Sequence, residues 1–374
     1  MERIVNPSDV RQSWSSLLAQ RFGIRLIVAG LLIVLGMFLW IAGVGKNEAL
    51  IRAATDGKLE YVRELLEKGA EVNAREKNGL TALKAASARG HVEIVKLLLE
   101  KGADLNAEDK GFSLRAAAWT GRLELAKLML DKGADVNDKD KVGRNALMYA
   151  CLYGRLEVAK FLVDQGADIN AKNGQDQTAL MHACVNDPLR FGSNQDHFEI
   201  AKLLLENGAD ANAVEMSGRT ALTRAAESCN EQIVKLLLEQ GADVNSKELT
   251  GMTALIWASC RGCYRVVREL LANGADVRVR NKEGHTALIA AVGRHCRDMK
   301  PGATMSLIDP LDGWLSRLSK EENSPEEVLK LLLRYGADIN ARDNGGRTAL
   351  IWARWTMLSI VKLLVEHGAD VNGE

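Results

Sequence analysis

The sequence is poor in the residues that build rigid turns and large aromatic cores. Its 374 residues include only 5 prolines against 33 glycines, and aromatic residues make up 5%. A loop-rich β protein normally uses both glycine and proline, so this imbalance indicates many positive-φ turns and few rigid ones. The hydrophobic content of 47% excludes a disordered chain.

The sequence also has no excess of positive or negative side chains. The 49 Lys and Arg residues balance the 49 Asp and Glu residues, so the net charge is zero. This balance excludes a strongly basic nucleic-acid-binding protein and an acidic tail protein. We therefore expect no nucleic-acid partner.

Sequence motifs of catalysis are absent as well. The chain contains no GxSxG, no HExxH and no Walker loop, and its six histidines are scattered. We expect a protein that is not an enzyme, with no catalytic residue, no cofactor, no metal and no small-molecule substrate.

One long apolar run lies near the N-terminus. Residues 26–45 carry no charge, and twenty helical residues span a hydrocarbon core of roughly 30 Å. Arg25 precedes the run and Lys46 follows it. The pattern predicts an N-terminal tail over 1–25 and a single-pass transmembrane helix over 26–45. A cleaved signal peptide and a buried core helix stay open as alternatives.

The flanking charges say little about orientation. The basic residues nearest the run are Arg11, Arg21 and Arg25 before it and Lys46, Arg52 and Lys58 after it. The two sides therefore carry equal numbers of basic residues. Arg3 and the free amine slightly favour an N-terminus on the cytoplasmic side of the membrane. The side of the membrane that carries residues 46–374 stays open.

Residues 46–374 repeat themselves. A Gly-Ala-Asp or Gly-Ala-Glu string recurs nine times, and each copy closes one unit. The units begin at Glu48, Thr81, Phe112, Asn145, Thr178, Thr220, Thr253, Thr286 and Thr348. Five of the eight intervals are 33 residues, and a fixed period of this size indicates a stacked solenoid.

The second unit explains the pattern physically. Thr81 caps a short helix of small residues, and Gly90 ends that helix. Residues 91–101 form a second, amphipathic helix that ends at a left-handed glycine, Gly102. We expect a polar turn over residues 106–110, which leads into the third unit.

These units resemble the ankyrin repeat. The matching features are the T-x-L-x-x-A start, the mid-unit glycine, the V-x-x-L-L run and G-A-D-x-N. The resemblance implies an all-α solenoid of stacked helix-turn-helix repeats over residues 46–374. The family's proline after threonine is alanine here, and its following histidine is replaced in every unit. The usual Thr–His hydrogen-bond network at the turn is therefore expected to be lost.

Two units are interrupted between their helices. The fifth carries an insertion at about 188–196, and the eighth carries one at about 296–324. Ser324, Pro325 and two glutamates then provide a strong helix start. The longer insertion either covers its own solenoid or contacts a partner or the membrane.

The six cysteines fall into two groups. Cys151 and Cys184 occupy equivalent first-helix positions and are predicted to be small core residues. The others lie near the turn between the two helices of three successive units: Cys229, Cys260, Cys263 and Cys296. A lone C-x-x-C pair is weak evidence for zinc, so we predict packing or incidental thiols there, with metal or redox function as the minor alternative.

The resemblance also predicts where a partner binds. Ankyrin-like arrays usually contact partners through their turn tips and the exposed ends of their first helices, on the concave face. The predicted partner-binding residues at these positions are Arg89, Trp119, Lys141, Arg144, Tyr153, Arg219, Met252, Arg261, Arg347 and Trp355. Exposed Trp, Tyr and Arg are typical of interface hot spots.

The sequence thus predicts a membrane-anchored ankyrin-repeat scaffold that binds a protein partner through its concave face. The alternative function is an extracytoplasmic protective or metal- or redox-handling ankyrin protein. The alternative requires the repeats to lie outside and the cysteine cluster to be oxidised or metal-bound.

Overall fold

A computed structural model describes residues 45–185, 193–292, 324–354 and 358–371. Every regular element in these ranges is an α-helix, and none is a strand. The chain divides into two compact units, Met1–Asn106 and Ala107–Glu374. From here on, the first unit and the second unit mean these two parts and not single repeats. The predicted α-helical repeat solenoid is confirmed for the part of the chain that is described.

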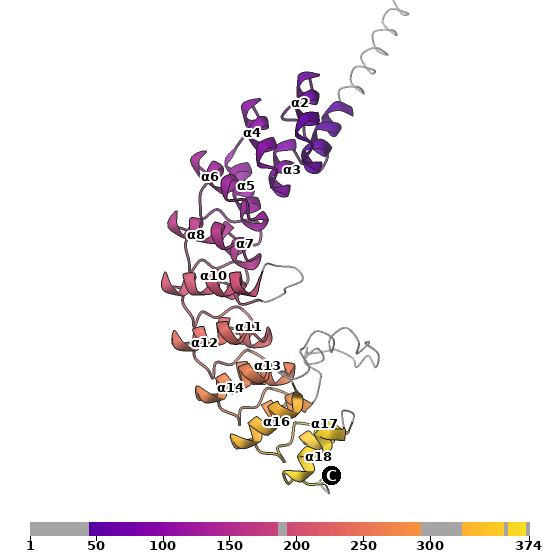
Figure 1. Cartoon of the computed structure of the whole chain (residues 1–374), viewed down its shortest axis with the longest axis vertical. Helices are drawn as coiled ribbons and strands as arrows, with labels where there is room; N and C mark the ends of the chain where they lie inside the picture. Colours follow the sequence, from indigo (N-terminus) through magenta and orange to yellow (C-terminus); the bar gives the residue numbers. More distant parts are fainter. Residues whose placement is uncertain (1–44, 186–192, 293–323, 355–357, 372–374) are drawn as a thin grey trace, which may run out of the picture. The chain divides into compact units, whose positions relative to one another are not determined.

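The first unit contains two helix pairs. Residues 45–56 are helical and precede α2 (Leu59–Glu67). The second pair is α3 (Ala82–Arg89) and α4 (Val92–Glu100), which pack against each other (Figure 1).

The second unit continues the same alternation of first and second helices (Figure 1). The first helices are α5 (Ala107–Thr120), α7 (Ala146–Leu152), α9 (Ala179–Ala183), α11 (Ala221–Glu227), α13 (Ala254–Arg261), α15 (Ala287–Val292) and α17 (Ala349–Ala353). The second helices are α6 (Leu123–Asp131), α8 (Leu156–Asp164), α10 (Asn194–Glu206), α12 (Glu231–Glu239), α14 (Tyr264–Ala272), α16 (Pro325–Arg334) and α18 (Leu358–Glu366). Each first helix packs on its neighbours, as α13 does on α11 and α15.

The start and stop signals act as predicted. Thr81 Oγ1 accepts a 3.2 Å hydrogen bond from the backbone N–H of Lys84 and so caps α3. Gly102, after α4, has φ of 85°, a left-handed conformation that costs glycine little. Because Ala85 and Ala86 are buried, neighbouring first helices can approach closely.

The recurring asparagine of the G-A-D-x-N motif joins one repeat to the next. Asn245 Oδ1 accepts from the backbone N–H of Asp276 at 2.8 Å, and its Nδ2 donates to the carbonyl of Gly274 at 3.1 Å. The same two hydrogen bonds recur from Asn73, Asn170 and Asn212. The motif is therefore a clamp between repeats as well as a turn signal.

The prediction of a turn over residues 106–110 is wrong. Helix α5 begins at Ala107 and runs for 14 residues through this stretch. The unit that begins at Phe112 starts 31 residues after Thr81, two fewer than the common interval, so the usual turn does not fit. Glu108 and Asp109 lie in the first turn of α5, where acidic side chains are favoured by the helix dipole.

The described edges of the insertions are helical. Helix α10 begins at Asn194 behind an N-cap at Ser193, so the end of the predicted 188–196 insertion belongs to the helix. Helix α16 begins at Pro325 behind Ser324, as predicted, although the Ser324 hydroxyl bonds the Glu326 side chain rather than the backbone.

Several predictions fall outside the described residues. These are the tail over 1–25, the apolar run over 26–45 except for Gly45, most of both insertions, and Trp355. None of the helices that the structure does describe is long and apolar enough to cross a membrane.

Candidate protein-interaction surface

Four of the turns between repeats are fixed by their first polar side chain. Asp140 Oδ1 accepts from the backbone N–H groups of Val142 and Arg144, both at 2.9 Å. The same pair of bonds forms at Asn173, Asn281 and Asp343. Each of these four turns is therefore held in one shape by its own side chain.

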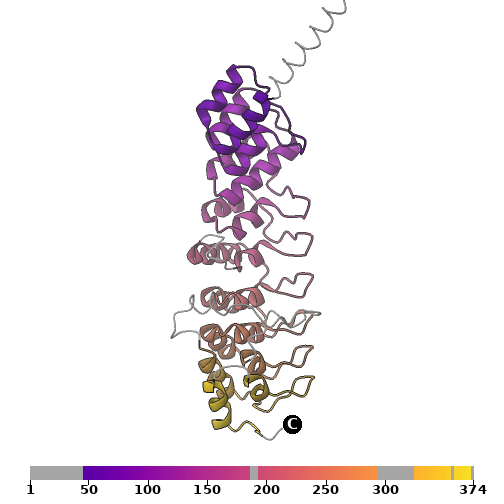
Figure 2. The same cartoon turned by 90° about the vertical axis from the view of Figure 1, so that its right-hand side faces the viewer.

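Successive turns are also joined to one another. The backbone N–H of Leu249 donates to the carbonyl of Ser217 at 3.0 Å. Equivalent bonds join Gly174 to Val142, Met216 to Gln175, Lys282 to Thr250 and Asn344 to Glu283. The turns of the second unit project to one side as a connected row (Figure 2). Side chains on this row are thus presented on a firm support.

A second contact ties each turn to the helix that follows it. Tyr149 OH donates to Asp140 Oδ2 at 2.7 Å, across nine residues. The indole N–H groups of Trp257 and Trp352 donate to Glu248 and Asp343 over the same separation, at 2.7 and 3.0 Å. We call this contact the turn–helix clamp.

The clamp shifts the pKa of its members. Burial raises the pKa of Asp140, but hydrogen bonds from Tyr149, Arg144 and Val142 outweigh it and hold the pKa below its usual value. Burial, together with the bond to Asp140, raises the pKa of Tyr149. Asp140 is therefore a carboxylate, and Tyr149 a neutral donor, at neutral pH.

Four aromatic rings meet beside the turn at Asp140. Phe112 and Trp119 lie edge to face at 5.8 Å, and Trp119 meets Tyr149 at 5.6 Å. Tyr149 stacks with Tyr153 at 6.4 Å. All four side chains are only half-buried. We call Phe112, Trp119, Tyr149 and Tyr153 the aromatic surface.

Cations border the aromatic surface. The guanidinium carbon of Arg144 lies 6.0 Å from the centre of the Tyr149 ring. The Nε atom of Arg144 is buried without a hydrogen-bond partner. Arg155 Nε donates to the carbonyl of Trp119 at 3.1 Å. Lys141 lies exposed in the adjoining turn. This edge of the surface is therefore basic.

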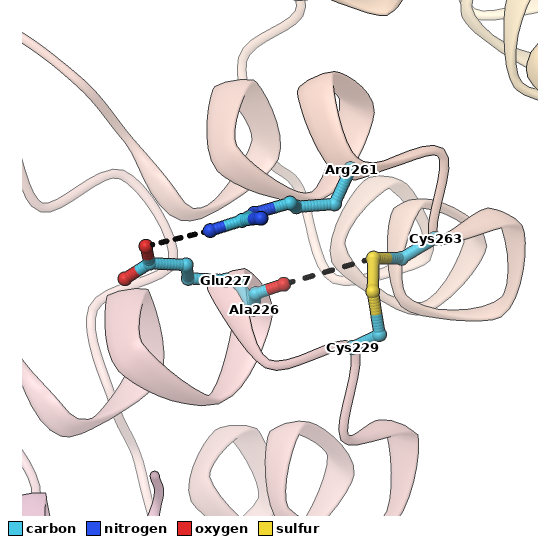
Figure 3. The surroundings of a disulfide bond; sticks show 5 residues. All are labelled: Ala226, Glu227, Cys229, Arg261 and Cys263. Atoms are coloured by element: carbon cyan, nitrogen blue, oxygen red, sulfur yellow. Dashed lines mark hydrogen bonds and ion pairs between the residues drawn. A yellow bond between two sulfur atoms is a disulfide. The ribbon is translucent and has the colours of Figure 1, made fainter. Parts of the chain in front are cut away.

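A second cluster joins α11 to α13. Arg219 pairs with Glu227 at 2.9 Å and with Glu248 at 3.1 Å, and its guanidinium lies 4.6 Å above the Trp257 ring. Arg261 pairs with the same Glu227 at 3.0 Å. These ion pairs join two repeats, and Figure 3 shows the pair of Arg261 with Glu227.

A disulfide lies at the same joint. Cys229 and Cys263 are bonded, with Cα atoms 5.4 Å apart (Figure 3). The prediction of packing or incidental thiols is wrong for this pair, because it compared equivalent positions of stacked units. Cys229 ends a first helix, whereas Cys263 precedes the second helix of the next repeat, and these two positions touch.

The predicted core cysteines behave as expected. Cys151 and Cys184 are fully buried free thiols. Burial raises the pKa of both and brings that of Cys184 to about 12. These two thiols are therefore protonated and unreactive.

The structure brings together some of the predicted partner-binding residues. Trp119, Tyr153 and Arg144 gather around Tyr149, and Lys141 lies in the same turn as Arg144. Arg219 and Arg261 instead share Glu227 in the joint between α11 and α13.

The other predicted residues are scattered or buried. Arg89 is exposed at the end of α3, and Arg347 is exposed but paired with Asp343 at 3.0 Å. The prediction that Met252 lies at an exposed turn tip is wrong, because it is 2% exposed and accepts a contact from Asn281 Nδ2 of the next repeat. The Met252 side chain points under the neighbouring turn.

Two members of the aromatic surface were missed from the sequence, Phe112 and Tyr149. The available signal for Tyr149 was its place nine residues after an acidic turn residue, which Trp257 and Trp352 share. Both tryptophans lie on first helices that pack on a neighbouring first helix. Their hydrogen bonds to turn carboxylates show a second role.

Metal chemistry has no support among the described residues. Within them, no group of three or more His, Cys, Asp or Glu side chains is placed to hold an ion. In the C-x-x-C pair, Cys263 is committed to Cys229.

Comparison with known families covers most of the chain. A family model described as ankyrin repeats in three copies matches residues 29–109, 114–214, 174–248 and 318–374. A second model, for ankyrin repeats in many copies, matches residues 237–291. No curated protein matches the chain. The paired helices, the asparagine clamps and these matches agree, and the chain belongs to the ankyrin-repeat family.

Proposed function

We propose that this protein is a membrane-anchored scaffold that binds a protein partner through the aromatic surface and the adjoining turn. Ankyrin-repeat proteins are typically protein-binding scaffolds without catalytic activity. The observation that carries the proposal is the contact of four half-buried aromatic rings on two neighbouring repeats.

The chemistry of the rings suits a binding surface. Tyr and Trp supply large contact areas at low entropic cost, and they dominate interface hot spots. Trp119 is supported on both sides, by Phe112 and by Tyr149. A partner side chain that covered these rings would gain apolar burial without first reorganising them.

Charge defines the kind of partner segment. Lys141 and Arg144 border the rings, while the nearby carboxylates are engaged: Asp140 with Tyr149, and Asp138 with Arg115. We infer that the partner presents an apolar side chain flanked by acidic ones. Complementary charge then guides its approach and register.

The anchor is residues 26–45. Its support is the uncharged length of the run, which suffices to cross a bilayer. We expect the full chain to stay with membranes through an alkaline carbonate wash and a variant lacking residues 26–45 to be released. Release of the full chain by that wash would contradict the anchor alone.

Site-specific photocrosslinking tests the binding surface in the native cell. A benzophenone amino acid at Tyr153 should yield a crosslinked partner. The same probe at Tyr335, which is 47% exposed at the end of α16, is the matched control. Equal crosslinking from both positions, or none from Tyr153, would overturn the proposed surface.

A further inference from the structure

The Cys229–Cys263 disulfide occupies a place where the repeat fold always brings two residues together. Cys229 stands where other units place glycine, such as Gly57 and Gly121, and it keeps the left-handed backbone with φ of 55°. Cys263 stands just before a second helix, as His91 and Arg155 do.

Other repeats show the same two positions in contact. A Cβ on Gly57 would lie 2.6 Å from the ring of His91, and one on Gly121 would lie 2.9 Å from Arg155 Cδ. A side chain at the first position therefore meets the side chain at the second. Cysteines placed at both have Cα atoms 5.4 Å apart, within the range that a disulfide spans.

This contact already carries cross-repeat bonds elsewhere. His91 Nε2 lies 3.2 Å from the carbonyl of Thr55, and Arg155 Nε donates to Trp119. At the Cys229 joint, Cys263 Sγ lies 3.9 Å from the carbonyl of Ala226, and the Arg261–Glu227 ion pair lies beside it (Figure 3). The disulfide thus adds a covalent link to a joint that is otherwise held by non-covalent contacts.

We infer that Cys229 and Cys263 are oxidised in the cell and that the repeats lie in an oxidising compartment, on the far side of the membrane. Structural disulfides persist outside the cytosol, whereas the cytosol keeps thiols reduced. The placement relative to the membrane rests on the proposed anchor. The oxidation of the pair does not.

The oxidation requires a partner of defined chemistry, a thiol–disulfide oxidoreductase in its disulfide form. One cysteine thiolate attacks that disulfide, and the second then attacks the mixed disulfide. The Cys229–Cys263 bond forms as the oxidoreductase bond breaks. Two electrons and two protons pass to the oxidoreductase, which leaves as a dithiol.

The flanking charges agree with this placement. The flanking basic residues are tied, and Arg3 with the free amine slightly favours an N-terminus inside. A single span with that orientation carries residues 46–374 to the opposite side. Because the flanking charges are nearly balanced, the disulfide carries the placement, and the charge pattern only agrees with it.

Peptide mapping tests the inference on the full chain. Thiols are alkylated in intact cells, and the protein is digested with trypsin without reduction. Cleavage after Arg261 separates Cys260 from Cys263, so the pair should appear as peptide 225–235 linked to peptide 262–265. Most of the protein should carry this link, and the link should be absent from a Cys229→Gly variant.

Recovery of both peptides alkylated and unlinked would overturn the inference. Carbonate washing of the same membranes separates this failure from failure of the anchor. If the Cys229–Cys263 peptides are linked but the chain is released by the wash, the anchor is contradicted and the oxidising compartment is supported. If the peptides are unlinked but the chain stays with the membranes, the oxidising compartment is contradicted and the anchor is supported.

Discussion

The indole Nε1 of Trp257 donates a 2.7 Å hydrogen bond to Oε1 of Glu248, nine residues earlier in the chain. The donor lies on the first helix of a repeat, and the acceptor lies in the turn that precedes it. Both side chains are buried, and burial raises the pKa of Glu248 despite the nearby Arg219. This contact holds one turn of the row on the helix that follows it, as Tyr149 does with Asp140 at the aromatic surface.

Trp257→Phe should destabilise the second unit by about 1–3 kcal/mol, because it leaves a buried carboxylate without one of its donors. Urea denaturation measures the loss. A double-mutant cycle with Glu248→Ala, which removes the acceptor, isolates the pair. Purely additive effects of the two substitutions would show that the hydrogen bond contributes nothing.

Much of the fold follows from the sequence because each unit carries its own start and stop signals. The threonine at Thr81 and the left-handed glycine at Gly102 fixed the helix limits. The long α5 could not be predicted in this way, because a two-residue shortening removes a turn without leaving a helix signal of its own. The turn–helix clamp also escaped prediction, because it depends on how a turn folds back onto its helix.

Asn245→Ala should cost about 1–2 kcal/mol, since it removes two hydrogen bonds between neighbouring repeats. The matched control is Arg278→Ala, at the equivalent position of the next unit, where no amide is present. Denaturation of both variants provides the comparison. Equal losses would indicate that the asparagine acts through its turn alone.

The disulfide should stabilise the oxidised protein by roughly 2–4 kcal/mol, because it closes a loop with a sequence separation of 34. A reductant should therefore lower the melting temperature of the wild type by several degrees. Cys229→Gly should lose the part of this sensitivity that comes from the Cys229–Cys263 bond, while the disulfide-bonded Cys260 keeps its own part. The variant should stay folded, since glycine suits the left-handed position. A melting temperature that falls as much on reduction in Cys229→Gly as in the wild type would contradict a role for this bond.

Stability should fall as the pH drops from about 7 to 5. Burial, with the charges of Arg224 and Arg144, lowers the pKa of His182 to about 3, against the weaker opposing effect of Glu215. Below about pH 6.5 His182 binds a proton in the unfolded chain but stays neutral in the folded chain. The free energy of unfolding therefore falls with pH, by about 2 kcal/mol at pH 5. The pKa of His285 is also lowered by burial and acts in the same direction.

His182→Ala isolates this contribution, because Ala85, Ala116 and Ala290 show that alanine fits the same position in other units. Denaturation at pH 5, 6 and 7 should give a shallower dependence than in the wild type, by up to one proton. Carboxylates with lowered pKa, such as Asp140 and Asp343, act below this range. An unchanged slope in His182→Ala would rule out His182 as the source.

The candidate site was predicted only in part. Trp119, Tyr153 and Arg144 were found because they stand at helix ends and turn tips. Met252 was wrongly placed at an exposed turn tip. It directly follows the turn glycine Gly251, where the side chain is already buried, and the repeat pattern does not distinguish this position from the exposed ones before it. The disulfide was missed because Cys229 and Cys263 are neighbours in space only across two unlike positions of adjacent repeats.

The central claim is that the aromatic surface binds the partner, and the affinity of the crosslinked partner tests it most directly. Trp119→Ala should weaken binding about tenfold or more, as truncation of an aromatic hot spot does. Tyr335→Ala, on an exposed residue outside the aromatic surface, should leave the Kd within about twofold of the wild-type value. A folded Trp119→Ala variant that binds as tightly as the wild type would contradict the account.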